Sequence, residues 1–177
     1  MKKIPRDTRW CAAPVAAGVL RRWLTDRGSL TARLERHAGA IRVQVLFQGL
    51  RRPHPDEVFL FAQPAERVLV REVVLLHGAT PLVFAHTVLA AESLRGAWRR
   101  ITGLGVRPLG AALFADPRIA RFPLRQKKLP RTHPLHQRAA AQLKRAPGPL
   151  WARRSIFAAG KSPILVSEVF LPAMLKL

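Results

Sequence analysis

The chain has 177 residues, a formal net charge of +21 and a hydrophobic fraction of 49%. This length and apolar content predict a single folded domain over residues 1–177 and exclude a disordered tail. A single cysteine excludes an intrachain disulfide framework and favours the reducing cytoplasm. No apolar run approaches the roughly 20 residues that a membrane span requires.

The excess of Lys and Arg has three interpretations: a polynucleotide partner, steering of small anions, or a coding bias toward arginine. The basic residues are spread along the chain, and tyrosine is absent, so an aromatic platform for stacked bases is not evident. We therefore expect no nucleic-acid partner. An RNA-binding protein remains an alternative that strong salt-dependent polynucleotide binding would reveal.

Two helices are predicted near the start of the chain. Pro14 to Asp26 carries apolar residues at helical spacing, and Leu30 to His37 follows Ser29, which can cap it. Two lysines ahead of the first helix imitate a secretion signal, but Pro14 and several arginines interrupt the apolar stretch, which favours a helix. Cys11 is expected to be a small buried hydrophobe.

The middle of the chain predicts strands. Ile41, Val43, Val45 and Phe47 alternate with polar residues and should share one face of a strand. Residues 68–76 and 81–89 form two apolar runs around a His-Gly-Ala-Thr turn and predict an antiparallel hairpin.

The rest of the chain mixes helical and extended signals. A helix is predicted for residues 92–101, a glycine-rich loop for 103–110 and a basic, proline-rich stretch with a short helix for 118–149. Two final strands are predicted at 150–158 and 164–171. Helices followed by mostly hairpin-connected strands indicate an α+β fold with a single antiparallel sheet.

The strongest candidate site residues are charged groups inside apolar strands. Glu168 is the only acid after Asp116, and it lies in the run Pro163 to Pro172. Arg71 lies in the other strong strand. A charge in such a place is costly to bury without a partner. The two residues can form a structural ion pair, or they can line a pocket for a small molecule with a carboxylate at one end and a hydroxyl at the other. The spacing leaves both alternatives open.

Other motifs do not support a cofactor or a metal. Gly160-Lys161-Ser162 lacks the earlier glycine of a phosphate-binding loop and precedes a strand rather than a helix. His133 and His136 have ligand-like spacing but no nearby cysteine or acid to complete a zinc site. His86 is either a core histidine or a group that faces a pocket shared with Arg71, because both lie in the predicted hairpin.

Several short segments, in order, resemble the chorismate lyase family. They are Ser29-Leu30-Thr31, Val70-Arg71-Glu72-Val73, Arg107-Pro108-Leu109-Gly110 with Leu113-Phe114, Ala152-Arg153-Arg154-Ser155, and Ser167-Glu168-Val169-Phe170-Leu171-Pro172. The order, the spacing and the final E-x-F-L-P are specific when taken together. Two residues depart from the family pattern. Leu30 stands where methionine is known from the family, and His86 stands where some members carry arginine.

The resemblance implies a sheet of about six strands with helices and flaps that enclose a ligand. It also implies conversion of chorismate to 4-hydroxybenzoate and pyruvate, for ubiquinone biosynthesis, without cofactor or metal, by a cytoplasmic protein that we expect to be a monomer. By the resemblance, Arg71 and Glu168 are catalytic and bind substrate, and Leu30 and Leu109 bind it through the backbone. A ligand-sensing domain of similar fold remains the other alternative.

Overall fold

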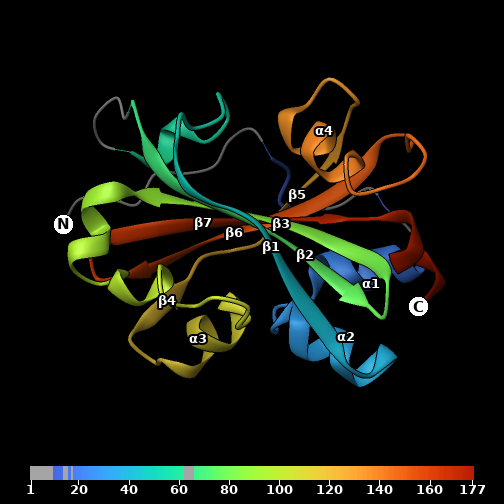
Figure 1. The fold of residues 1–177 in the computed structure, drawn as a ribbon, viewed down its shortest axis with the longest axis horizontal. Coiled ribbons are helices and arrows are strands. Elements are labelled where there is room, and N and C mark those ends of the chain that lie inside the picture. Colours follow the sequence, from blue (N-terminus) through green and yellow to red (C-terminus); the bar gives the residue numbers. More distant parts are fainter. Residues whose placement is uncertain (1–9, 14–15, 17, 62–65) are drawn as a thin grey trace.

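The computed structural model describes residues 10–13, 16, 18–61 and 66–177. Within these residues one antiparallel sheet of seven strands has the order β1-β2-β3-β7-β6-β4, and β5 also pairs with β6 (Figure 1). The strands are β1 (Ile41–Arg51), β2 (Val68–His77), β3 (Thr80–Ala90), β4 (Ile119–Arg121), β5 (Arg125–Leu129), β6 (Leu150–Ala159) and β7 (Ser162–Phe170). The helices are α1 (Gly18–Thr25), α2 (Leu30–Ala38), α3 (Leu109–Ala115) and α4 (Pro134–Ala140).

This architecture confirms the predicted α+β class with one antiparallel sheet. The hairpin of β2 and β3 turns at Gly78, whose φ of 57° lies in the left-handed region that glycine tolerates best. The strands β4 and β5 were not anticipated. They are short, and β5 consists mainly of basic and polar residues, so neither shows the apolar alternation that reveals a strand.

The predicted alternation of β1 is only partly correct. The pairing of β1 with β2 shifts register between Val45 and Phe47, which is the signature of a β-bulge. Val43 therefore pairs with Leu75 and faces one side of the sheet, whereas Phe47 pairs with Glu72 and faces the other. The bulge has a useful consequence, because beyond it Gln48 lies directly beside Arg71.

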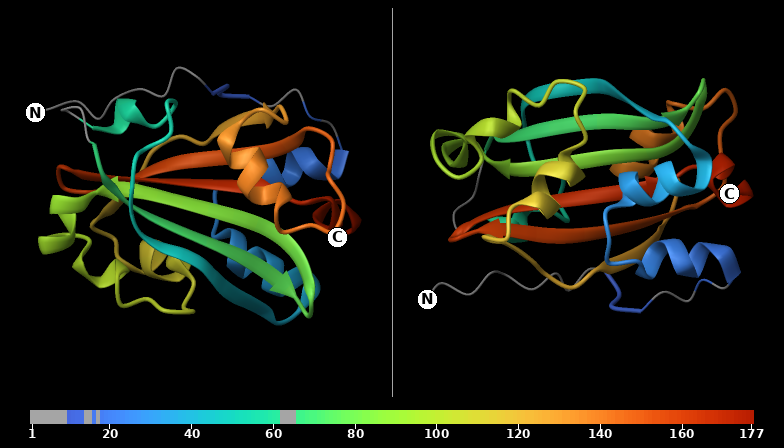
Figure 2. Two further views of the ribbon diagram at one scale, coloured as in Figure 1. Left: turned by 45° about the horizontal axis from the view of Figure 1, so that its top comes forward. Right: turned by 90° about the horizontal axis from the view of Figure 1, so that it is seen from below.

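The helices are divided between the two faces of the sheet (Figure 2). The helices α1, α2 and α3 lie on one face, which we call the front face. The helix α4 and the segment 52–61, which contains the 3₁₀ turn η1 (Val58–Leu60), lie on the back face. Successive residues of a strand point to opposite faces, so neighbouring charged residues in one strand are delivered to different environments.

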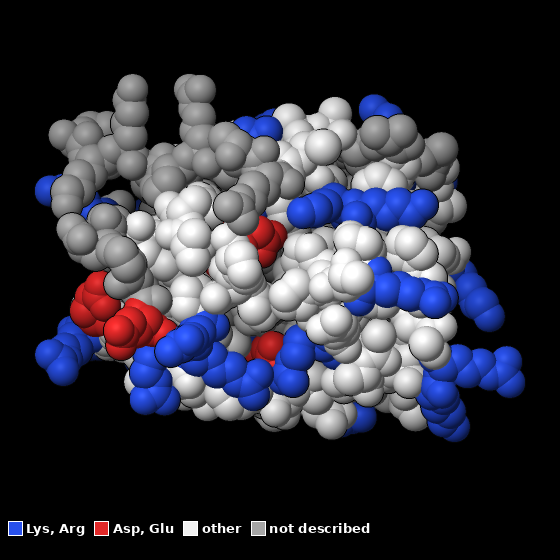
Figure 3. Space-filling model, turned by 90° about the horizontal axis from the view of Figure 1, so that it is seen from above, with Lys and Arg blue, Asp and Glu red and all other residues white. Residues whose placement is uncertain are grey.

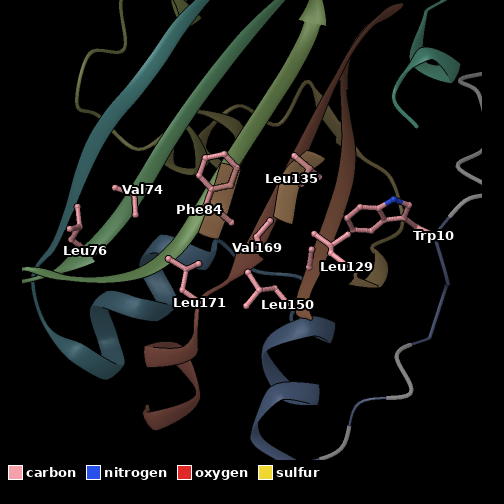
Figure 4. Close-up of a cluster of buried hydrophobic side chains, with 11 residues drawn as sticks. Trp10, Val74, Leu76, Phe84, Leu129, Leu135, Leu150, Val169 and Leu171 are labelled. Carbon is pink, nitrogen blue, oxygen red and sulfur yellow. The ribbon is translucent and has the colours of Figure 1, made fainter. Parts of the chain in front are cut away.

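A large apolar cluster fills the back face beneath α4 (Figure 4). Phe84 and Val169 come from the centre of the sheet, Leu135 comes from α4, and Trp10 closes one edge. Burying a side chain of this size contributes about 1.5–3 kcal/mol. The front face has two separate apolar clusters, one beneath α1 and α2 and one around Trp98. This separation leaves room for a polar site between them.

Three local predictions need correction. Residues 92–101 form two 3₁₀ segments, η2 (Ala91–Arg95) and η3 (Arg99–Ile101), instead of an α-helix. The predicted glycine-rich loop runs into α3, which begins at Leu109. Cys11 is exposed rather than buried, and its backbone forms an isolated bridge with Gln126 of β5.

The first predicted helix is shorter than expected: α1 begins at Gly18, and the expected start at Pro14 lies outside the described residues. The second begins at Leu30 as predicted, with Ser29 accepting a hydrogen bond from the amide of Ala32. No helix in the described part of the chain is long and apolar enough to cross a membrane.

Candidate functional site

A pocket opens on the front face between the sheet and the helices α2 and α3. It holds about 690 Å³ of space outside the protein atoms, a figure that includes open solvent at its mouth. All four residues that the sequence analysis selected line it: Leu30, Arg71, Leu109 and Glu168. The structure therefore brings together positions that are up to 138 residues apart in the chain.

Two helix starts cover the pocket. Leu30 is the first residue of α2, and Leu109 is the first residue of α3. The first N–H groups of a helix have no partner within the helix and attract anions. The two starts approach closely: a Cβ built on Gly110 would lie 3.1 Å from the Ser29 hydroxyl oxygen. Glycine at position 110 thus allows the two covering segments to meet over the cavity.

Arg71 is buried without a carboxylate partner. Its side chain donates a hydrogen bond of 3.0 Å to Gln48 Oε1 and another of 2.9 Å to the carbonyl of Gly105. Among the described residues, no acid lies within ion-pair distance of it. Burial lowers the pKa of Arg71 because it disfavours the charged form. A guanidinium has five N–H donors, so donors remain for an anionic ligand.

Glu168 pairs with Arg153, not with Arg71. Arg153 Nε lies 2.6 Å from Glu168 Oε2, and the same guanidinium donates to the carbonyls of Trp23 and Asp26. The ion pair that the sequence analysis considered between Arg71 and Glu168 is therefore absent, because β3 separates their strands. The side chain of Glu168 stays 20% exposed and lines the pocket, whereas that of Arg153 is 1% exposed.

Arg121 is a pocket residue that the sequence analysis missed. It lies at the end of β4, donates to the Ser155 hydroxyl at 3.2 Å and to the carbonyl of Arg27, and packs against the rings of Phe114 and Phe157. Burial, together with the like charge of Arg153, lowers the pKa of Arg121 to about 10. Only its position between the apolar residues Ile119 and Phe122 hinted at partial burial.

The back face carries a different charged cluster, centred on His86. His86 Nε2 lies 3.1 Å from Glu57 Oε1, and His86 Nδ1 lies 3.2 Å from Glu72 Oε1. Arg138 also pairs with Glu72, and the ring of His54 stacks on that of His86 with centroids 4.8 Å apart. The suggestion that His86 shares a pocket with Arg71 is therefore wrong: His86 pairs across the hairpin with Glu72, on the opposite face.

The pKa values in this cluster follow from its contacts. Burial alone lowers the pKa of His86, but the charges and hydrogen bonds of Glu57 and Glu72 outweigh it and raise the pKa to about 9. The pKa of Glu72 is lowered to about 2, because hydrogen bonds and charges from His86 and Arg138 outweigh the opposing effect of burial. The pKa of Glu57 is also lowered by the two histidines, against burial. The cluster is therefore a group of opposite charges in contact with one another.

One group of side chains on the back face has metal-ligand chemistry. Donor atoms of His54, Glu57 and His86 lie within 4.8 Å of one another. However, His86 lies between two carboxylates that raise its pKa to about 9, so at neutral pH its positive charge offsets theirs. His133 and His136 each have other partners, Asp56 at 3.4 Å and the carbonyl of Gly148 at 2.8 Å.

The positive charge is not confined to the pocket. On the side of the molecule that carries α4, Lys and Arg side chains are scattered over the surface, with few acids among them (Figure 3). Such a field attracts anions over a distance of roughly a Debye length, about 8–10 Å at physiological salt.

Comparison with known sequences identifies the family. The chorismate lyase profile matches residues 10–176. The chain belongs to the chorismate lyase family. A protein of Nitrosomonas europaea named "Probable chorismate pyruvate-lyase" is 46% identical over 177 residues, covering 99% of each chain. A protein of Aromatoleum aromaticum with the same name is 47% identical over 183 residues, covering 100% of this chain and 99% of its own.

Solved structures share the fold at low sequence identity. The effector domain of PhnF from Mycobacterium smegmatis has a TM-score of 0.54 at 16% identity, covering 82% of this chain and 90% of that one. A GntR-family transcriptional regulator from Bacillus cereus has a TM-score of 0.52 at 9% identity, covering 75% and 92%. At these identities the likeness concerns the fold alone.

Proposed function

We propose that this chain converts chorismate to 4-hydroxybenzoate and pyruvate in the front-face pocket. The observation that carries the proposal is the pairing of unlike groups in one cavity. Arg71, a buried cation with no acid partner among the described residues, and Glu168, a carboxylate held in place by Arg153, both line it. Family membership supports the same reaction.

The sheet register sets the separation of the two groups. Arg71 lies on β2 and Glu168 on β7, with β3 between them. Two strand spacings place their backbones about 10 Å apart across the sheet. Thr87 and Ala85 of β3 lie between them on the pocket floor. This width accommodates one six-membered ring with a carboxylate directed to Arg71 and a hydroxyl directed to Glu168.

The ring carboxylate binds at the Arg71 end. The fork of a guanidinium matches a carboxylate, and burial strengthens the contact because water is excluded. The backbone N–H groups of Leu30 and Leu109, at the starts of α2 and α3, add donors above the same group. Substitution of the familiar methionine by leucine at position 30 has little effect, because the contact uses the main chain.

The hydroxyl end faces Glu168, which accepts its hydrogen bond. Arg153 holds this carboxylate in one orientation, so little reorganisation is needed when the ligand binds. In the reaction the ether C–O bond breaks, the ring carbon that bears the hydroxyl loses its hydrogen, and the enolpyruvyl group leaves and gains a proton to become pyruvate. The ring becomes aromatic, so the protein has mainly to orient the ether for elimination.

We propose further that the reaction needs no cofactor or metal, and that the chain acts as a cytoplasmic monomer in ubiquinone biosynthesis. The charged side chains that line the pocket can serve the proposed reaction without another reagent. The cytoplasmic assignment rests on the lone cysteine and on the family.

Incubation of the purified protein with chorismate tests the proposal. Equimolar 4-hydroxybenzoate and pyruvate should appear, at a rate proportional to the protein concentration. Binding of 4-hydroxybenzoate without turnover of chorismate would instead favour the ligand-sensing alternative. Binding of polynucleotides with a steep salt dependence, and no turnover, would favour the RNA-binding alternative.

A further inference from the structure

The pocket contains a second cation, Arg121, in addition to Arg71. Arg121 lines it beside Ser155 and Phe157, and its hydrogen bonds go to a hydroxyl and a main-chain carbonyl. Among the described residues no carboxylate lies within ion-pair distance of Arg121. Arg153 also lines the pocket, but its guanidinium already donates hydrogen bonds to Glu168 and to two main-chain carbonyls.

The register places Arg121 opposite Arg71. Arg71 pairs with Thr87, Thr87 with Val166, and Val166 with Ser155, so these four residues form one row across β2, β3, β7 and β6. The side chain of Arg121 reaches the last member of this row. Three strand spacings, about 14 Å at the backbone, therefore separate the two sides of the pocket. Each side ends in a guanidinium that has no acid partner in the part of the chain that the structure describes.

Glu168 lies on β7, between these two sides. It is two residues along the strand from Val166, the member of the Arg71 row on β7. A ligand that fits this arrangement carries two anionic groups and, between them, a hydrogen-bond donor that faces Glu168. Chorismate has this chemistry. Its ring carboxylate is opposite the hydroxyl, and its enolpyruvyl ether is on the carbon next to the hydroxyl.

We infer that Arg121 binds the carboxylate of the enolpyruvyl group and so distinguishes the dianionic substrate from the monoanionic product. The inference rests on the proposed function and specifies its substrate contacts. Phe114 and Phe157 flank the guanidinium, with ring centroids 5.1 Å and 5.2 Å away, and restrict its motion. When the ether bond breaks, the group bound by Arg121 departs as pyruvate. The product 4-hydroxybenzoate then contacts Arg71 and Glu168 but no longer Arg121.

The variant Arg121→Gln tests this assignment with two ligands. We expect kcat/KM for chorismate to fall by roughly 30-fold or more, as for loss of a partly desolvated charged contact. The Kd of 4-hydroxybenzoate, measured by calorimetry, should stay unchanged, and competitive inhibition by pyruvate should weaken. Arg121→Lys keeps the charge and should recover part of the chorismate affinity. Arg118→Gln is the matched control, because Arg118 lies three residues away, is exposed and pairs with Asp116.

Loss of both affinities to the same extent in a folded variant would show that Arg121 only shapes the pocket and would overturn the inference. Unchanged kcat/KM would overturn it as well. If Arg121→Gln does not fold, Arg121→Lys applies the same test, since selective weakening of chorismate is still required. If the unmodified protein does not turn chorismate over, the proposed function fails. The relative Kd values of chorismate and 4-hydroxybenzoate in protein and variant still test Arg121.

Discussion

The two faces of the sheet treat buried charge in opposite ways. On the back face, Glu57, Glu72, His86 and Arg138 form ion-pair contacts with one another. On the front face, the partners of Arg71 and Arg121 among the described residues are neutral, and Glu168 stays partly exposed. Adjacent residues Arg71 and Glu72 belong to different faces. Ion-pair contacts stabilise a fold or fix its geometry, whereas unpaired cations in a cavity indicate an anionic ligand.

The largest effect on activity is expected from Arg71→Ala. It removes the cation proposed for the ring carboxylate, and loss of such a contact costs about 2–5 kcal/mol of binding. Both chorismate and 4-hydroxybenzoate should lose affinity, unlike in Arg121→Gln. Gln48 and the Gly105 carbonyl can turn to water, so folding should suffer less than binding. Steady-state kinetics and thermal melting on one preparation measure both effects. A near-normal kcat/KM would remove Arg71 from the site.

The charged cluster around His86 on the back face should make the stability of the protein depend on pH. The pKa of His86 is about 9 in the folded protein against 6.5 ordinarily. A raised pKa means that the folded state holds the proton more tightly than the unfolded state. The contribution of protonated His86 to the free energy of unfolding is therefore complete below pH ~6.5, and it is lost as the pH rises toward ~9. The loss should be about 3 kcal/mol. The groups that face His86 are Glu57, Glu72 and His54.

Urea unfolding at several pH values between 6 and 9.5 measures this loss. His86→Asn should be less stable at pH 6 and should show a flatter profile over the same range. His77→Asn is the control, because His77 is exposed at the end of β2. A steep profile that persists in His86→Asn would show that another group is responsible.

Much of this comparison could be foreseen from the sequence. The hairpin-connected apolar runs identified the sheet, and lone charges within those runs identified Arg71 and Glu168. The partner of Glu168 was not foreseen, because register across three strands decides it. The adjacent Arg153 and Arg154 offered a clue, since neighbours in a strand must face opposite ways. Arg121 was missed because β4 is only 3 residues long and has no readable alternation.

A smaller effect than that of Arg71→Ala is expected from Glu168→Gln. Glutamine keeps one acceptor oxygen for the ring hydroxyl but loses the charge, and a neutral hydrogen bond is roughly half as strong. Turnover should fall by about 10- to 100-fold, which corresponds to about 1.4–2.7 kcal/mol. Arg153 keeps the carbonyls of Trp23 and Asp26, so the melting temperature should fall only modestly. A variant that melts far lower but turns chorismate over normally when folded would show that Glu168 is structural.

Removal of metal ions should have the smallest effect, namely none on turnover. The charged groups of the front-face pocket, Arg71, Arg121, Arg153 and Glu168, form a set suited to organic anions, with a single carboxylate that is already paired. The group that most resembles a metal site, His54, Glu57 and His86, belongs to the back face. Dialysis against EDTA should therefore leave kcat and KM for chorismate unchanged.

Activity that disappears and returns with a divalent ion would contradict the cofactor-free proposal. In that case, repeating the dialysis with His54→Ala would show whether the back-face group is the source, because a front-face ion would still be needed in that variant. The result thus decides whether an ion is needed and, if it is, whether the back-face group holds it.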